Sequence, residues 1–309
     1  MRAKEAAAIL VIAVASACGG SGVKSANSPN SAPAAKILPG SWHQVVTTTA
    51  SGTNGLAVDG SGNIFVAEIN DNKVEEFSKT GALIATLGGQ GSAPGQLSEP
   101  AKITLDSNGD LYVTEIGNER IQEFSPTGRP VAVWGSVGTG PGQFNWPVGI
   151  AVDSTGNVYV CDLNNDRIEV FTPDRKILIV WGQRGEEPGH LYAPYDLALD
   201  RSGRVYVGEV ATYRLQVFSS NGALIAQWGH QGTAAGDFSD VKGIAIDTTG
   251  AVYVGDIGNN RIEKFSSDGT YVGQWPGPGP LLDDHTEIAL DAQDHLYVSV
   301  RNEVFRLAT

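Results

Sequence analysis

The sequence is poor in cysteine and in charge. It contains 2 Cys among 309 residues, and only 18% of its residues are charged. A small disulfide-stapled fold and a disordered chain are both excluded, because 41% hydrophobic residues over this length allow a large core. Cys161 stands where other copies of the repeat described below have Ala67, Thr114, Gly208 and Gly255, so we expect a small buried residue rather than a reactive thiol.

Basic residues are scarcer than acidic ones. Lys and Arg total 21 against 34 Asp and Glu, which gives a formal net charge of −13. Nucleic acids and anionic membrane surfaces are both bound mainly through Lys and Arg. We therefore expect no nucleic-acid partner and no membrane contact except through a lipid anchor.

The N-terminal apolar run, residues 6–17, is too short to span about 30 Å of hydrocarbon as a helix. It follows Arg2 and Lys4 and ends in small residues before Cys18, which is typical of a secretory signal. The segment resembles a bacterial lipoprotein signal, in which Cys18 would carry the lipid. Ala15 departs from that pattern, so cleavage without lipidation and a cytosolic location are the alternatives.

Residues 18–40 are mainly Gly, Ser, Pro, Ala and Asn, which is typical of a flexible tether. We therefore predict a lipoprotein-type signal peptide at residues 1–17, a tether at 18–40 and a folded domain at 41–309. The expected location is outside the cytoplasmic membrane, anchored by lipid and facing the periplasm or the exterior.

An internal repeat fills the predicted folded domain. One Asp recurs every 47 residues and the last follows after 44, at Asp59, Asp106, Asp153, Asp200, Asp247 and Asp291. Trp134, Trp181, Trp228 and Trp275 keep the same step, and Leu87 holds that position in the first copy. The chain therefore contains five full copies and a shortened sixth.

Each copy alternates short apolar runs, rich in Val, Ile, Tyr and Phe, with turns of Gly, Asn, Asp and Pro. No helical period is sustained, so each copy predicts about four strands. Six such sheets are expected to close into an all-β, six-bladed β-propeller. The sixth copy ends after its third strand, and we expect the segment Ser41–Thr47 to supply the fourth and close the ring.

The repeat is clearest in GIAVDSTGNVYVCDLNNDRIEVF (149–171) and GIAIDTTGAVYVGDIGNNRIEKF (243–265). This pattern resembles the NHL repeat of six-bladed propellers, and it extends over residues 41–309. The NHL family includes extracytoplasmic sensor domains of bacterial kinases, a peptide-amidating lyase and animal RNA-binding regulators. The resemblance therefore implies the fold much more than the activity.

Two recurring motifs have structural explanations. In the Asp-x-x-Gly-Asn turns we expect Asp to cap turn amides and Gly62 and its equivalents to take positive φ, rather than to bind calcium. An acid and a base also recur five residues apart, and we expect each pair to brace one hairpin. These pairs are Glu68 and Lys73, Glu115 and Arg120, Asp162 and Arg167, Glu209 and Arg214, and Asp256 and Arg261.

The innermost strands show a departure from the repeat. Four residues before the repeat Asp, glycine alternates with charge: Gly55, Gly149 and Gly243 in odd copies, and Lys102, Asp196 and Glu287 in even ones. We expect the three charges to converge near the mouth of the central channel, where His285 could join them. They would either satisfy one another or hold an ion or the polar end of a ligand.

The family resemblance implies a metal-dependent alternative, because propeller lyases and lactonases place a divalent metal in this channel. The five histidines show no metal-ligand spacing, so we expect no cofactor and no catalytic residues. Under the alternative, one divalent cation would be held in the channel, with Lys102, Asp196, His285 and Glu287 as catalytic residues.

The second departure is aromatic. Trp146, Tyr192 and Tyr195 lie in the connections that enter copies three and four, Tyr213 replaces a polar residue in copy four, and Arg184 lies nearby in sequence. Such a cluster predicts a ligand-binding patch, although Trp146 and Tyr192 could equally fill gaps between blades.

These observations favour a non-enzymatic, monomeric recognition module that binds a protein, peptide or envelope glycan. The runner-up is a metal-dependent lyase or hydrolase centred on the channel, and RNA binding comes third.

Overall fold

The structure is a computed structural model that describes residues 34–49, 52–279, 282–283 and 285–308. The predicted signal peptide, Cys18 and most of the predicted tether lie outside the described residues. Within the described part, no helix has the length and apolarity needed to cross a bilayer.

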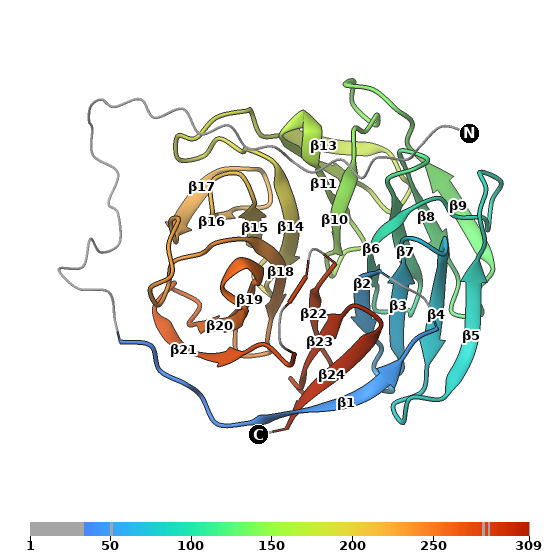
Figure 1. Ribbon diagram of the computed structural model, residues 1–309. Helices are drawn as coiled ribbons and strands as arrows, with labels where there is room; N and C mark the ends of the chain where they lie inside the picture. The colour runs from blue at the N-terminus through green and yellow to red at the C-terminus, as the bar shows by residue number, and fades with distance from the viewer. Residues whose placement is uncertain (1–33, 50–51, 280–281, 284, 309) are drawn as a thin grey trace, which may run out of the picture. The chain divides into compact units, whose positions relative to one another are not determined.

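The described chain forms six four-stranded antiparallel sheets, each one blade of a propeller. Figure 1 shows the blades in a ring, with the first strand of each nearest the centre. The predicted six-bladed, all-β architecture is confirmed, including four strands in every complete repeat.

The strands of blades 1 to 5 follow one another outward from the channel in sequence order, and blade 6 takes its outermost strand from the N-terminal end of the described chain. Blades 1 to 3 consist of β2 (Thr53–Val58), β3 (Ile64–Glu68), β4 (Lys73–Phe77) and β5 (Leu83–Gly88); β6 (Pro100–Leu105), β7 (Leu111–Glu115), β8 (Arg120–Phe124) and β9 (Pro130–Trp134); and β10 (Pro147–Val152), β11 (Val158–Asp162), β12 (Arg167–Phe171) and β13 (Ile177–Trp181). Blades 4 to 6 consist of β14 (Pro194–Leu199), β15 (Val205–Glu209), β16 (Arg214–Phe218) and β17 (Leu224–Trp228); β18 (Val241–Ile246), β19 (Val252–Asp256), β20 (Arg261–Phe265) and β21 (Tyr271–Pro276); and β22 (Glu287–Leu290), β23 (Leu296–Val300), β24 (Glu303–Ala308) and β1 (Ser41–Thr47). Two single-turn 3₁₀ helices, η1 (Leu163–Asn165) and η2 (Ile257–Asn259), follow β11 and β19.

The ring closes through the two ends of the folded chain. Strand β1 pairs antiparallel with β24, in a register that runs from Ser41 opposite Ala308 to Thr47 opposite Glu303. Figure 1 shows β1 lying along β24 at the outer edge of blade 6. The N-terminal strand thus completes the last blade, as the sequence predicts.

Contacts with the propeller begin before β1, inside the segment predicted as tether. The backbone N–H of Leu38 donates to the carbonyl of Gln274 at 2.9 Å, and Trp275 Nε1 donates to the carbonyl of Pro39 at 3.0 Å. Leu38 also packs against the hydrophobic cluster between blades 5 and 6. Residues 37–40 are therefore anchored on blade 5 by backbone pairing and apolar burial.

The repeat Asp organises the turn between the first two strands of each blade. In blade 1, Asp59 Oδ1 accepts the backbone N–H groups of Ser61 and Asn63, both at 2.8 Å. Gly62 adopts φ 87°, and Asp294 takes the same role in blade 6 with φ 64°. The predicted turns are confirmed: Asp replaces backbone acceptors, and glycine supplies the left-handed conformation.

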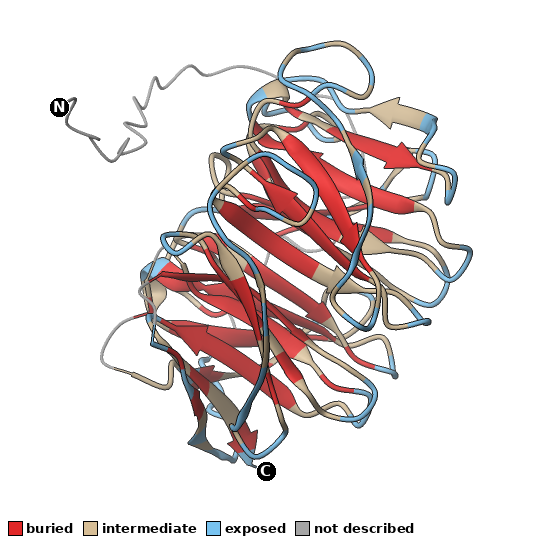
Figure 2. Ribbon diagram, turned by 90° about the vertical axis from the view of Figure 1, so that its right-hand side faces the viewer, coloured by how far each residue is buried: buried red, intermediate tan, exposed pale blue. Residues whose placement is uncertain are grey.

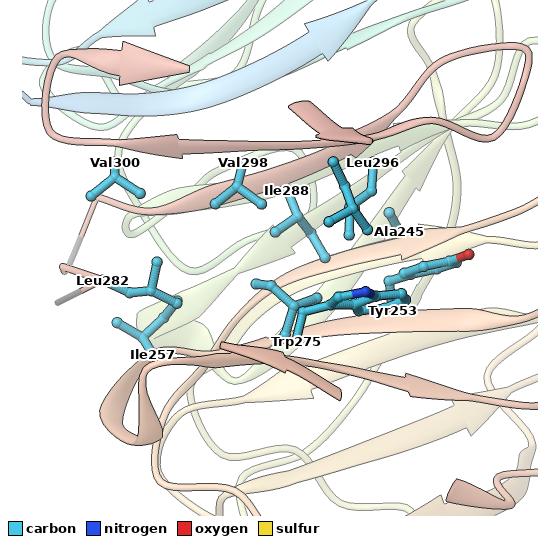
Figure 3. Close-up of a cluster of buried hydrophobic side chains, with 11 residues drawn as sticks. Ala245, Tyr253, Ile257, Trp275, Leu282, Ile288, Leu296, Val298 and Val300 are labelled. Atoms are coloured by element: carbon cyan, nitrogen blue, oxygen red, sulfur yellow. The ribbon is translucent and has the colours of Figure 1, made fainter. Parts of the chain in front are cut away.

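The hydrophobic core is divided among the blade interfaces, so burial follows the middle strands of each blade (Figure 2). The recurring Trp lies at these interfaces. The ring centroid of Trp228 is 5.7 Å from that of Tyr206 in its own blade and 6.0 Å from that of Phe265 in the next blade. Figure 3 shows the interface of blades 5 and 6, where Trp275 stacks on Tyr253. Their ring centroids are 6.0 Å apart and the angle between the ring planes is 9°. Each blade thus packs one face against the preceding blade and the other face against the following blade.

Candidate functional site

The recurring acid and base pairs hold the connections between blades. In blade 2, Arg120 Nε bonds Glu115 Oε1 at 2.6 Å, while its Nη atoms donate to the carbonyls of Ser92 and Gln96 in the preceding connection. Glu115 Oε2 also accepts the backbone N–H of Ser98 at 2.9 Å. The pair therefore fixes the connection from blade 1 to blade 2, in addition to its own hairpin.

A third buried group completes each of these clamps, and it alternates around the ring. Blades 2 and 4 place Gln122 and Gln216 beside the pair, whereas blades 1, 3 and 5 place Glu75, Glu169 and Glu263 there. Burial raises the pKa of Glu169 and that of Glu263 to about 7. In the odd blades two carboxylates thus share one cation.

The central triad consists of Lys102, Asp196 and Glu287, which are 3%, 5% and 5% exposed. The Lys102 ammonium forms an ion pair with Glu287 and donates to the carbonyl of Lys242 at 3.0 Å. Asp196 Oδ2 accepts the backbone N–H of Ile244 at 2.8 Å, and the Lys102 charge acts on this carboxyl group. The expected convergence is confirmed, with the lysine serving both acids.

Glycine in the odd blades makes room for this triad. A Cβ atom on Gly149 would lie 2.8 Å from Asp196 Cα and 2.9 Å from Cys161 Sγ. The innermost strands therefore approach too closely for six side chains at this level, and only every second blade contributes one.

Burial also sets the protonation of the triad. It lowers the pKa of Lys102 to about 8, partly offset by Asp196, and it raises the pKa of Asp196 above its usual range. Cys161 is buried, and burial raises the pKa of its thiol well above the ordinary value. That thiol is the small buried residue expected from the repeat.

A channel of about 300 Å³ extends from the triad along the innermost strands. Beyond Lys102, Asp196 and Glu287 its lining is mainly Val, Leu, Ile and Ala from all six of these strands. The triad therefore lies at the end of a channel whose other side chains are mainly aliphatic, on the side of the interblade connections.

His285 does not join the triad within the described residues. Its backbone N–H donates to Asp283 Oδ1 at 3.1 Å, and no hydrogen bond or ion pair connects its ring to Glu287 in the described part. The described residues also contain no group of three or more His, Cys, Asp or Glu placed to hold a metal. The triad does not fit a divalent cation, because the Lys102 ammonium already pairs with Glu287, one of the two carboxylates that such an ion would need.

Two of the predicted aromatic residues meet above the triad. Trp146 and Tyr195 both pack against a small buried cluster that contains Leu163. The Tyr195 ring lies 5.2 Å from Lys102 Nζ and 5.4 Å from Lys242 Nζ, within cation–π range of both. A tyrosine flanked by two lysines therefore lies beside the triad.

Arg184 and Tyr192 form a second pair in the connection from blade 3 to blade 4. The guanidinium lies 4.5 Å from the tyrosine ring centroid, and Nη2 donates to the Tyr192 hydroxyl at 2.9 Å. Arg184 Nη1 also lies 3.8 Å from Asp166 Oδ2, and the side chain of Arg184 is 66% exposed. The stacked pair therefore presents a fixed cation and an aromatic edge to solvent.

Tyr213 lies apart from these residues, against the cluster between blades 4 and 5 that contains Phe238 and Val241. Tyr213 also differs in chemistry from the residues at the same position of the repeat. In the preceding two blades, Glu119 and Asp166 accept the backbone N–H groups of Trp146 and Ala193, at 2.7 and 2.8 Å. Tyr213 has no carboxylate or amide for this bond.

Sequence reasoning missed Glu119 and Asp166 as parts of the site. Glu119 and Asp166 are 47 residues apart, so the repeat marks them as equivalent. It does not show that they fix the backbone of the aromatic connection.

Comparison with known proteins agrees with this architecture. A family model described as the NHL repeat matches residues 144–171, and no curated protein matches the chain. Among solved structures, a streptogramin B lyase is 16% identical, with a TM-score of 0.64, covering 87% of this chain and 97% of its own. A gluconolactonase from Xanthomonas campestris is 15% identical, with a TM-score of 0.67 and coverage of 88% and 91%. A chain of a nidogen/laminin complex is 20% identical, with a TM-score of 0.57 and coverage of 72% and 80%. These likenesses show the fold.

Proposed function

We propose that this chain, a six-bladed β-propeller with NHL repeats, is a non-enzymatic recognition module. Its ligand would be a protein, peptide or envelope glycan held on the face of the interblade connections. The protein would act as a monomer outside the cytoplasmic membrane, anchored there through lipid on Cys18.

The observation that carries the proposal is the exposed Arg184 and Tyr192 pair. A guanidinium stacked on a tyrosine and hydrogen-bonded to its hydroxyl is held in place before any partner arrives. Arginine and tyrosine are also the residue types that dominate binding energy at interfaces. Trp146 and Tyr195 extend the same face towards the channel mouth.

The central triad supports binding rather than metal chemistry, because Lys102 forms an ion pair with Glu287 and its charge also acts on Asp196. Solved propellers of this fold include a lyase and a gluconolactonase as well as part of a nidogen/laminin complex, so the fold is compatible with either class. A metal-dependent lyase or hydrolase at the channel is the alternative that the experiments must separate.

The test is capture of envelope proteins and of arrayed envelope glycans by the purified protein and by an R184A/Y192A double variant. We expect the double variant to lose at least about tenfold in affinity for the captured ligand, or about 1.4 kcal/mol. The control is R204A, which removes a guanidinium 5.5 Å from the Tyr206 ring, in one of the Asp-containing turns. Equal capture by all three proteins would refute the proposed surface.

Elemental analysis of the purified protein addresses the alternative. We expect less than stoichiometric zinc, iron or manganese, and no change in metal content in E287Q. One equivalent of such a metal per chain, lost in E287Q, would support the lyase or hydrolase.

A further inference from the structure

The interface between blades 1 and 2 lacks the large side chain that fills its counterparts. Leu87 occupies the position of Trp134, Trp181, Trp228 and Trp275. At the interfaces of blades 3 and 4 and of blades 4 and 5, a turn glycine of the next blade closes over the indole: a Cβ on Gly222 would lie 2.5 Å from Trp181 Cγ. At the interface of blades 1 and 2 the equivalent turn glycine, Gly128, closes over Leu87. The turn is thus in the same place, but it covers leucine rather than the larger tryptophan.

A second substitution removes a hydroxyl from the same interface. Tyr206 and Tyr253 donate their hydroxyls to the repeat Asp of their own blades, at 3.3 and 3.2 Å. Blade 1 carries Phe65 at this position, which can make no such bond to Asp59.

These changes surround a cavity of about 330 Å³. Its apolar lining includes Phe65, Leu87, Leu105 and Leu111, and its polar side chains are Asp59, Asn63, Glu76, Ser125 and Thr127. This volume lies within the range of small-molecule sites in proteins.

The cavity has two acids and no cation. Asn63 Nδ2 bridges the carboxylates of Asp59 and Glu76, at 3.0 and 3.3 Å. Neither acid forms an ion pair within the described residues. The aliphatic part of the Lys79 side chain lies beside the turn at Gly62, but its ammonium forms no ion pair with either acid in this part of the chain. An apolar chamber with unneutralised carboxylates favours a ligand that brings positive charge.

At the interface of blades 2 and 3, the residue equivalent to Glu76 is paired with a cation. Glu123 is the equivalent of Glu76, and Arg175 of blade 3 binds its Oε2 atom through Nε at 3.0 Å and Nη2 at 2.7 Å. The residue at the position of Arg175 in blade 2 is Gly128, which has no side chain. The interface of blades 1 and 2 therefore lacks both the indole and the cation that its neighbour possesses.

The interface of blades 5 and 6 provides a contrast. A cavity of about 250 Å³ lies there beside Trp275 and Tyr253, two residues labelled in Figure 3. Lys264 lines that cavity and its ammonium lies 3.3 Å from the carboxylate of Asp247, so the repeat Asp of blade 5 has its own cation.

We propose that the cavity between blades 1 and 2 binds a small organic cation. Its ammonium or guanidinium group pairs with Glu76 and Asp59, and its apolar body lies against Leu87, Leu105 and Phe65. The lining of this ligand site includes neither the central triad nor the Arg184 and Tyr192 pair, and the site does not depend on the function proposed above.

The probe is tryptamine, which combines an indole with an ammonium group, titrated calorimetrically into the purified protein. We expect saturable binding with one site per chain. Indole-3-propionate, which replaces the ammonium with a carboxylate, should bind at least about tenfold more weakly, because its charge repels both acids.

Two variants locate the site without removing a core contact. L87W introduces the residue that four other blades carry and should fill the cavity. E76V introduces the residue found at Val170 and Val217 and should remove the pairing carboxylate. Each should lower tryptamine affinity at least about tenfold while thermal unfolding stays cooperative.

The control is K264A, which changes the other cavity and should leave tryptamine affinity unchanged. Absence of binding to the unaltered protein would overturn the proposal, as would equal affinity in L87W and the unaltered protein. A loss of affinity in K264A alone would move the site to the interface of blades 5 and 6 and overturn it equally.

Discussion

Individual glycines decide how many side chains the centre of the ring can hold. Lys102, Asp196 and Glu287 occupy it because Gly149 and its equivalents let neighbouring innermost strands come close. This alternation is visible in the sequence, since glycine and charge exchange places at every step of the repeat. The pairing of Lys102 with Glu287 is not, because sequence does not show which of the two acids the ammonium approaches.

The first prediction concerns this close approach. G149A should destabilise the protein by about 1–3 kcal/mol, because the added methyl group meets the backbone of Asp196 and must push two blades apart. G60A is the control, since a Cβ there has no neighbour within 4 Å. Urea denaturation measures both, and equal stability of the two variants would contradict the packing argument.

A second prediction at this scale concerns the shared cation in blade 3. Burial raises the pKa of Glu169 to about 7 in the folded protein, whereas the ordinary pKa of glutamate is 4.5. Stability from this group is therefore complete below the unfolded pKa and is lost as the pH rises through 7. E169Q, which copies Gln122 and Gln216, should abolish this loss, an effect on the order of 1 kcal/mol.

The measurement is urea denaturation of the unaltered protein and of E169Q at pH 5 and pH 8. We expect E169Q to gain stability relative to the unaltered protein at the higher pH only. E187Q, at an exposed position, is the control, and a gain of the same size there would remove Glu169 as the cause.

At the scale of elements, the strands followed from the repeat but the connections did not. Apolar alternation and turn residues define β2 to β24, and the missing strand of the last repeat indicates β1. The clamps on the connections depend on backbone carbonyls, such as those of Ser92 and Gln96, which have no signature in sequence. The cavity beside Leu87 depends in turn on Gly128 in the next blade, so the substitution of Trp alone could not reveal it.

The clamp of blade 2 gives the element-scale prediction. R120M should cost about 3 kcal/mol, because Glu115 stays buried without its cation and the carbonyls of Ser92 and Gln96 lose their donors. Limited proteolysis should cut first in the connection at residues 89–99. Cleavage elsewhere, with that connection intact, would show that the arginine does not fix it.

For the whole molecule, closure depends on one pairing between the ends of the folded chain. Deleting residues 41–47 should leave the outer edge of β24 unpaired and open to association with other chains. We expect the deletion to lower the unfolding temperature and to produce concentration-dependent aggregates in light scattering. A monomeric deletion variant of unchanged stability would show that β1 does not close the ring.

The same pairing has a consequence in time. Ser41 belongs to β1, the first strand in chain order among the described residues, and its partner Ala308 belongs to β24, the last of them. Strand β1 therefore waits without its partner throughout synthesis, while blades 1 to 5 can assemble in order beside it. The ring is completed only after β24 has been made, so its closing contact joins two strands that are separated in the chain by all of blades 1 to 5.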